Sequence, residues 1–223
     1  MKLDSFKIKN LSETKAEIYI YGDIVDNGWK WFETDVTPED VKRQLDALKG
    51  KELTVYINSA GGDVFAGMAI HNMLKRHEGK VTGHVDGVAA SIASAILMAC
   101  DEIEVPENAY VMIHRPTMTA HGDMDAMLSA AGLLETIEDG LITTYAEHTT
   151  LSREAIADLL AAETWFTGAQ LSETFNTNIV VTDAVKVAAC ATEASYKNCP
   201  VKFAAENQNA TKLKEIEIAL AIN

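Results

Sequence analysis

Short apolar segments of strand length alternate with segments of helical periodicity from residue 16 to residue 181, and this order constrains the fold most strongly. The first strand-like segment, Ala16–Tyr21, ends at a glycine. A helix-like segment then begins at Thr37 and Pro38, and an apolar strand follows over Leu53–Ile57. When a helix connects two neighbouring strands, it carries the chain back to the end of the sheet where the first strand began. The second strand then runs in the same direction as the first, so the two pair in parallel. We therefore predict an α/β fold of layered βαβ units.

The same alternation continues towards the C-terminus. It predicts strands over 81–85, 102–105, 110–113 and Ile179–Val181, and helices over 64–76, 91–100, 123–149, 153–160 and from about Gly168. Thr167 and Gln170 have the spacing of a capping box at the start of the last of these helices. The pattern weakens near residue 185, so we assign residues 1–185 to one domain and residues 186–223 to a C-terminal tail or docking helix.

The charge balance excludes two classes of partner. The chain has 33 acidic and 19 basic residues, for a net charge of −14. Binding to nucleic acid or to an anionic membrane needs clustered cations, so we expect neither partner.

Three cysteines without metal-ligand spacing indicate a reducing compartment and no zinc site. No segment has the character of a signal peptide or a bilayer span, so we expect a cytoplasmic protein without a metal or other cofactor.

A glycine pair follows the second strand, in the segment INSAGGD (57–63). Glycines at the end of a strand can bring bare backbone N–H groups to a ligand, because no Cβ blocks the approach and positive φ is allowed. The segment has neither the Walker A pattern nor the dinucleotide-binding pattern. A tight strand-to-helix turn without a functional role is the structural alternative.

A serine stands between a strand and a helix in the segment GVAASIASA (87–95). The Ser91 hydroxyl and the Ile92 N–H would both lie at a helix N-terminus, where the partial positive charge favours an oxyanion. The structural alternative is that Ser91 only caps a buried helix.

A histidine ends a strand in the segment YVMIHRP (110–116). The proline that follows favours an extended exit from the strand at His114. A hydrogen-bonded structural role is the alternative for this residue. His121, in the loop after the proline, could also approach a cleft, although no specific signal places it there.

The three motifs NSAGGDVFAGMAI (58–70), GVAASIASAIL (87–97) and VMIHRP (111–116) occur in the order that resembles the ClpP family of serine peptidases. The resemblance covers about Ile18 to Val185. The segments WKWF (29–32) and WFT (165–167) are most similar to its phage branch, the ClpP-like head maturation proteases. The resemblance implies a ClpP/crotonase-like layered βαβ superhelix with a protruding handle helix over 123–149. It also implies a homo-oligomeric ring, a heptamer that can stack as a tetradecamer.

The same resemblance implies roles for individual residues. Ser91 would be the nucleophile and His114 the base that takes its proton. The N–H groups of Gly62 and Ile92 would form the oxyanion hole. A protein or peptide substrate would pair as an added strand with the backbone of Gly61–Asp63.

The third member of the catalytic triad stays open, because ClpP peptidases have an aspartate where this chain has Thr164. Glu163 is the nearer chemical substitute, since a carboxylate can orient and stabilise an imidazolium. Neighbouring residues on a strand face opposite ways, so the two side chains cannot both point towards the histidine from a regular strand.

These features predict a serine endopeptidase that cuts proteins such as scaffold or capsid precursors during phage head maturation. If the substrate must be unfolded first, a separate ATPase would do so. The alternative, motivated by Thr164, is a non-catalytic or weakly active ring scaffold with the same fold. A crotonase-type acyl-CoA enzyme is less favoured, because no acid follows the glycine-alanine segment at residues 87–90.

Overall fold

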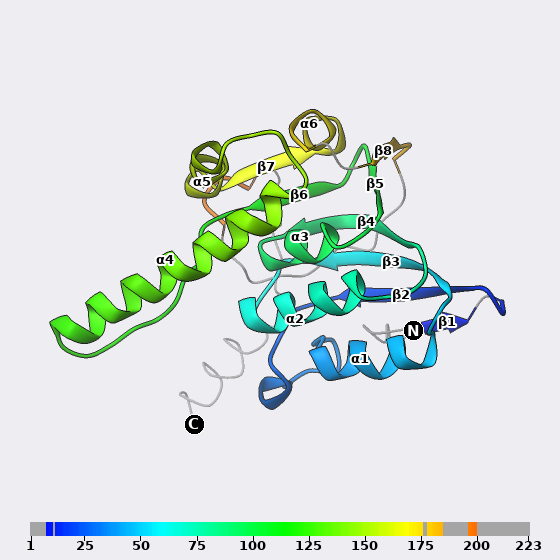
Figure 1. Cartoon of the computed structure of the whole chain (residues 1–223), viewed down its shortest axis with the longest axis horizontal. Helices are drawn as coiled ribbons and strands as arrows, with labels where there is room; N and C mark the ends of the chain where they lie inside the picture. The colour runs from blue at the N-terminus through cyan, green and yellow to red at the C-terminus, as the bar shows by residue number, and fades with distance from the viewer. Residues whose placement is uncertain (1–7, 11, 176–177, 185–195, 200–223) are drawn as a thin grey trace, which may run out of the picture.

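One sheet of eight strands organises the described part of the chain, residues 8–10, 12–175, 178–184 and 196–199 of a computed structural model (Figure 1). Its main path runs through β1 (Ile8–Asn10), β2 (Lys15–Tyr21), β3 (Glu52–Ser59), β4 (Val81–Ala90), β5 (Glu102–Pro106) and β8 (Ile179–Thr182). These strands pair in parallel, except that β1 is antiparallel to β2. Off this path, β6 (Tyr110–Ile113) is parallel to the end of β4, and β7 (Thr164–Thr167) is antiparallel to β6. The predicted α/β class is therefore confirmed.

The helices occupy two regions of the fold. The chain contains α1 (Pro38–Ala47), α2 (Val64–Lys75), α3 (Ile92–Leu97), α4 (Met124–Ala146), α5 (Arg153–Ala161) and α6 (Gly168–Thr174), besides a short 3₁₀ turn at Asn27–Trp29. Helix α2 packs between α1 and α3, and Figure 1 shows the three side by side along the sheet. Helices α5 and α6 flank β7, and α4 projects away from the sheet.

Side chains of the sheet form much of the core. Strand β2 buries every second side chain, and β3 buries nearly all of them towards its end. In β2, Ala16, Ile18 and Ile20 are buried while the residues between them stay partly exposed. Strand β3 buries both faces towards its end, as expected for a central parallel strand covered by helices. The end of β3, which leads into the glycine pair, is therefore held firmly in the core.

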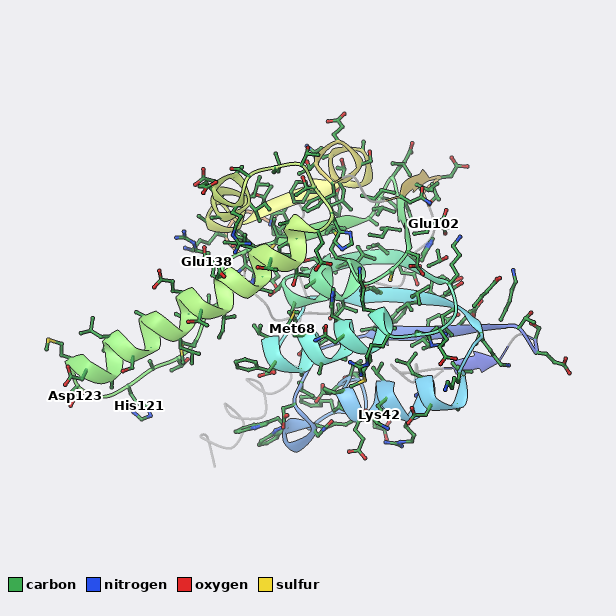
Figure 2. All side chains as sticks on the ribbon, in the orientation of Figure 1. Lys42, Met68, Glu102, His121, Asp123 and Glu138 are labelled. Atoms are coloured by element: carbon green, nitrogen blue, oxygen red, sulfur yellow. The ribbon has the colours of Figure 1, made fainter. Side chains whose placement is uncertain are left out.

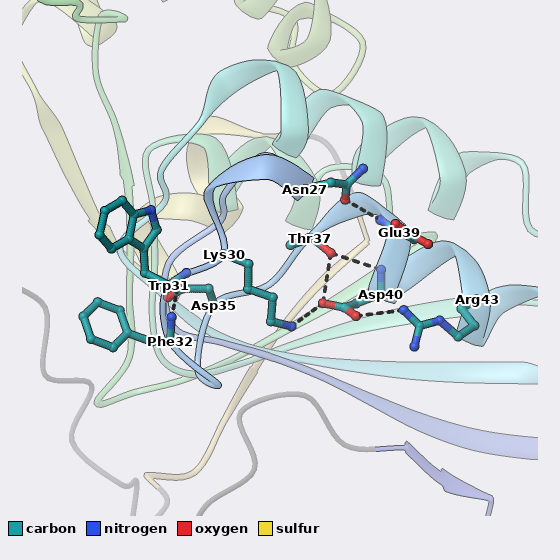
Figure 3. Close-up of polar contacts among 9 residues, drawn as sticks. All are labelled: Asn27, Lys30, Trp31, Phe32, Asp35, Thr37, Glu39, Asp40 and Arg43. Carbon is teal, nitrogen blue, oxygen red and sulfur yellow. Dashed lines mark hydrogen bonds and ion pairs between the residues drawn. The ribbon is translucent and has the colours of Figure 1, made fainter.

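The start of α1 follows the capping rules predicted from the sequence (Figure 3). The Thr37 hydroxyl accepts the Asp40 N–H at 3.2 Å, and Pro38 occupies the first turn. The Asp40 carboxylate in turn binds the Lys30 ammonium at 2.5 Å and the Arg43 guanidinium at 3.2 Å. These contacts connect α1 to the loop that precedes it.

The aromatic residues of the WKWF segment lie at the surface of that loop. The Asp35 carboxylate accepts the backbone N–H groups of Trp31 and Phe32, each at 2.9 Å (Figure 3). Their rings are 76% and 70% exposed, so they add nothing to the core. Asp35 thus orders a loop whose aromatic side chains face solvent in the single chain.

Strand β4 is longer and α3 shorter than the sequence predicts. Strand β4 extends to Ala90 rather than ending at residue 85, because its small residues pair with β6, Ala89 with Val111 and Ala90 with Met112. Small residues have low strand propensity, so the pattern alone does not reveal this pairing. Helix α3 begins only at Ile92, since the backbone of Ser91 is not helical.

Helix α4 runs without interruption from Met124 to Ala146 and matches the predicted handle over 123–149. A Cβ at Gly132 or Gly140 would meet nothing within 4 Å, so these glycines do not reflect close packing within the chain. Figure 2 shows His121 beside the start of α4, at its far end from the sheet. His121 is exposed at that end of α4.

Candidate active site

Ser91 stands at a sharp turn between β4 and α3. Its φ of 54° and ψ of −129° are unusual for a residue with a side chain, and such strain is often retained at functional sites. The side chain makes no capping hydrogen bond to α3, so the alternative that Ser91 only caps this helix is wrong. Instead, its Oγ lies 2.8 Å from Nε2 of His114.

The register of two parallel strands brings this pair together. Strand β6 lies beside the end of β4, with Ala90 opposite Met112, so both strands end at the same edge of the sheet. The Ser91 N–H donates to the Met112 carbonyl at 2.9 Å and continues this pairing into the turn. Ser91 and His114 follow the two strand ends and therefore meet.

The imidazole of His114 is suited to accept a proton at neutral pH. Burial lowers its pKa below the usual value of a histidine, and the negative charge of Glu163 offsets this effect only in part. The ring is therefore neutral near pH 7, and the Nε2 that faces the Ser91 hydroxyl can act as an acceptor.

The glycine pair forms a turn that only glycine fits. Gly61 and Gly62 have φ of 101° and 143°. A Cβ on Gly61 would lie 2.7 Å from the Ser91 Cβ, and one on Gly62 would lie 2.0 Å from the Ile24 carbonyl oxygen. The tight-turn alternative is thus correct as geometry, but the turn also lies directly against Ser91.

Two backbone donors remain unpaired in the described part of the chain, one on Gly62, which shares the cleft lining with Ser91, and one on Ile92, the residue after Ser91. Ile24 pairs with the turn by donating to the Gly61 carbonyl at 2.8 Å and accepting the Asp63 N–H at 2.7 Å. The Gly62 N–H and the Ile92 N–H, by contrast, have no acceptor within the described ranges. Two unpaired backbone donors of this kind are one requirement of an oxyanion hole.

Asp63 is already engaged within the chain. Its N–H donates to Ile24, and its carboxylate accepts the Ala66 N–H at 2.7 Å as the cap of α2. The Asp63 N–H therefore has no capacity to pair with a substrate strand in this structure. Gly61 and Gly62 are the residues of the turn that face the cleft described below.

The two candidates for a third catalytic residue have different surroundings. The Thr164 hydroxyl donates to the Leu159 carbonyl at 2.7 Å. Glu163 lies just before β7 with φ of 50°, and its carboxylate accepts the backbone N–H groups of Lys197 at 3.0 Å and Asn198 at 2.6 Å. Within the described ranges, neither side chain is hydrogen-bonded to the His114 ring. The negative charge of Glu163 nevertheless raises the pKa of His114.

The pKa of Glu163 lies below its usual value. Partial burial raises it, but the N–H groups of Asn198 and Lys197, the Trp165 indole and the nearby His114 together lower it more. The carboxylate is therefore ionised across the neutral range and supplies a negative charge beside the imidazole.

The three sequence motifs meet at one cleft of about 660 Å³. Ser91, His114, Glu163 and the glycine pair all line it, whereas the other candidates, Asp63, Ile92 and Thr164, are not part of the lining. Residues that the sequence did not single out complete the lining: Asp23, Ala60, Arg115, Thr117, Leu160, Ala161, Ala162, Tyr196, Lys197 and Asn198. Most of these are loop residues without a motif, and only the fold reveals their position.

Three of the four described residues of the predicted tail lie against this cleft. Tyr196, Lys197 and Asn198 belong to its lining, and the Asn198 amide donates to the Ala162 carbonyl at 2.8 Å. Part of the segment that we assigned to a tail or docking helix therefore contributes to the site.

Two absences hold for the residues that the structure describes. These residues contain no cluster of three or more His, Cys, Asp or Glu side chains that could hold a metal ion. None of their helices is long and apolar enough to cross a lipid bilayer.

Comparison with known proteins agrees with this geometry. The chain is 29% identical over 145 residues to an ATP-dependent Clp protease proteolytic subunit of Bacteroides fragilis, which covers 62% of this chain and 70% of that protein. It is 31% identical over 109 residues to the corresponding subunit of Deinococcus radiodurans, which covers 48% of this chain and 53% of that protein.

A solved structure and a family model give the same result. A ClpP1 mutant from Listeria monocytogenes superimposes with a TM-score of 0.62 at 25% identity, covering 77% of this chain and 92% of that chain. This match confirms the ClpP-like fold. The family model of the Clp proteases matches residues 33–176, which hold all three motifs. Since that match spans more than half of the sequence, the chain belongs to the Clp protease family.

Proposed function

We propose that this chain is a serine endopeptidase in which Ser91 is the nucleophile and His114 the general base. The observation that carries the proposal is the 2.8 Å contact between Ser91 Oγ and His114 Nε2, two residues that line one cleft. A serine hydroxyl is a weak nucleophile at neutral pH and needs a base within hydrogen-bond reach. The neutral imidazole of His114 meets that need.

The reaction follows from these positions. His114 Nε2 takes the hydroxyl proton as Ser91 Oγ attacks the carbonyl carbon of the scissile peptide, and the N–H groups of Gly62 and Ile92 bind the resulting oxyanion. The imidazolium then gives its proton to the leaving amine, and the C–N bond breaks to leave an ester on Ser91. Water, deprotonated by His114, attacks the ester and releases the acid, while the proton returns to Ser91 Oγ.

Glu163 is the third catalytic residue that we favour. Its carboxylate is ionised, and its charge already acts on His114, so it would stabilise the imidazolium formed during the reaction. The Thr164 hydroxyl is committed to the Leu159 carbonyl and carries no charge. The scaffold alternative is motivated by the threonine that stands where ClpP peptidases have an aspartate. Because Glu163 can supply the missing negative charge, Thr164 gives that alternative little support.

The substrate class and the biological setting rest on the resemblance to phage ClpP-like proteases. We propose that the enzyme cuts scaffold or capsid precursors in the host cytoplasm during head maturation. The WKWF segment (29–32), one of the two segments on which this resemblance rests, exposes the aromatic residues Trp29, Trp31 and Phe32. A protein substrate would lie extended along Gly61 and Gly62, where backbone recognition tolerates varied sequences.

A ring of identical subunits is part of the same proposal. The protruding half of α4 exposes Met124, Leu128 and Leu133, which are 73%, 63% and 44% accessible in the single chain. Exposed apolar side chains on a helix indicate an interaction surface. We propose a heptamer that can stack through α4, with any unfolding of substrate done by a separate ATPase.

A fluorophosphonate probe tests the proposed mechanism directly. Such probes react with serine only when a base and an oxyanion hole activate it. We expect labelling of the native protein at Ser91, located by mass spectrometry, and none after heat denaturation. Absence of labelling in folded, assembled protein would favour the scaffold alternative, and labelling at another serine would refute the assignment of Ser91.

The pH dependence of kcat/KM tests the charge state of the pair. Because burial lowers the pKa of His114, activity should persist below the usual histidine value of about 6.5 and fall only as the pH drops through the lowered pKa. Replacement of Glu163 by glutamine removes the charge that raises this pKa, so the acid limb should move to lower pH and kcat should fall by on the order of 10-fold or more.

The matched control for this charge removal is Glu107→Gln, since Glu107 lies exposed in the turn between β5 and β6. That variant should keep the wild-type pH profile. An acid limb that stays unchanged in Glu163→Gln would exclude Glu163 as the electrostatic partner of His114.

A further inference from the structure

Tyr196 contacts three parts of the candidate active site that come from distant parts of the sequence. Its hydroxyl donates to the carbonyl of Ala60, the residue before the glycine pair. Its ring lies 5.6 Å from the His114 ring in a T-shaped arrangement with an interplanar angle of 78°. It also packs against the buried cluster of Val88, Ala90 and Met112 near the ends of β4 and β6.

The segment that carries Tyr196 is anchored by hydrogen bonds to the residues before β7. The two Glu163 oxygens accept the N–H groups of Lys197 and Asn198, and the Asn198 side chain donates to the Ala162 carbonyl. The Trp165 ring meets the Tyr196 ring at 5.6 Å in a second T-shaped contact. These contacts hold the tyrosine in one orientation.

The segment forms a wall of the cleft and leaves it open. Ser91 and His114 line the same space of about 660 Å³ as Tyr196, Lys197 and Asn198. An obstructing segment would fill that space, whereas this one bounds it. Its contacts are with the catalytic histidine and with the start of the oxyanion turn.

We infer that Tyr196 is a positioning residue of this active site, which holds the Ala60–Gly62 turn through its hydroxyl and keeps the His114 ring facing Ser91 through its own ring. The inference rests on the proposed peptidase function. Small displacements of catalytic groups are costly, because reaction requires a narrow range of distances and angles. Nothing in the sequence pattern marks this tyrosine, which lies outside residues 33–176 matched by the family model.

Two variants separate the tasks of the hydroxyl and the ring. Tyr196→Phe keeps the ring contacts but loses the bond to Ala60, so kcat should fall about 3- to 10-fold with KM nearly unchanged. Tyr196→Ala loses both, and we expect kcat to fall by about 10- to 100-fold. Tyr19→Phe is the matched control, since the Tyr19 hydroxyl bonds Glu17 on β2, outside the residues that line the cleft, and kinetics should stay at the wild-type level.

The titration of His114 supplies a readout that a purely structural role would not change. Burial lowers the pKa of this residue, and Tyr196 is one of the side chains packed against it. Tyr196→Ala should therefore raise the pKa towards its usual value, while Tyr196→Phe should leave it unchanged. The charged side chains around the same cleft are kept in both variants: Asp23, Arg115, Glu163 and Lys197.

This titration can be followed by NMR, with His114→Gln used to assign the signal among six histidines, and it needs no catalytic activity. An unchanged His114 pKa in Tyr196→Ala, or a change confined to KM, would overturn the inference. A rise in kcat/KM in Tyr196→Ala would also overturn it and show an obstructing segment instead. If the wild-type protein neither cleaves peptides nor reacts with the probe, the peptidase proposal fails, and the NMR titration still judges the packing of Tyr196 on His114.

Discussion

Replacement of Ser91 by alanine is expected to reduce kcat/KM for peptide cleavage by on the order of 10⁴-fold or more while the fold stays intact. The Ser91 hydroxyl makes one described hydrogen bond, to His114, so its loss removes the nucleophile without breaking a structural contact. Activity measured with a fluorogenic peptide or a denatured protein and stability measured by thermal unfolding would check both parts. The residual rate would come from positioning and the oxyanion hole alone.

Ser129→Ala is the matched control for this substitution. Ser129 is exposed on α4, and within the described part of the chain its hydroxyl donates to one group, the Asp125 carbonyl one turn earlier. This variant should keep full activity and full labelling by the fluorophosphonate probe. Wild-type cleavage by purified Ser91→Ala would reject Ser91 as nucleophile, whereas equal loss in both variants would point to an effect of assembly.

The proposed catalytic pair could be singled out from sequence because each of its residues belongs to a short motif with its own local signal. The contact between them depends on a long-range register that local patterns do not encode. Strand β4 had to extend to Ala90 and pair with Met112 for Ser91 and His114 to meet. The small residues at the end of β4 resemble a turn or a helix start in sequence, so this part of the strand was missed.

The sequence leaves Glu163 and Thr164 both open as the proposed third catalytic residue, because a regular strand through both would turn their side chains to opposite faces. In the structure, Glu163 has φ of 50° and lies just before β7, so strand alternation does not apply to it. A left-handed conformation at a glutamate has no sequence signal, because glycine, asparagine and aspartate are the residues that usually mark it.

Tyr196 illustrates a different limit. It lies in a stretch without strand or helix periodicity, and its contacts are with residues about 30 to 140 positions away, such as Trp165 and Ala60. Periodicity predicts which face of a local element is buried, but not which distant side chain completes a cleft. The sequence therefore predicts the centre of the site well and its outer wall poorly.

The second large effect is expected at the oxyanion turn, where Gly62→Ala should impair both folding and catalysis. A Cβ on Gly62 would lie 2.0 Å from the Ile24 carbonyl oxygen, a backbone atom that cannot rotate away. The φ of 143° is itself unfavourable for alanine. Together, strain and overpacking should lower the free energy of unfolding by about 2–5 kcal/mol.

Catalysis should fall further than the loss of folded protein explains. Movement of the turn away from Ile24 would displace the Gly62 N–H from the oxyanion position, and loss of one such donor typically costs about 10²–10³ in kcat. Gly140→Ala provides the control, since its Cβ would meet nothing on α4, and it should gain about 0.5–1 kcal/mol with unchanged kcat. Rates measured at a temperature where Gly62→Ala is folded by circular dichroism separate the two effects. Wild-type kcat in that folded variant would mean that the glycine turn shapes the fold without binding the oxyanion.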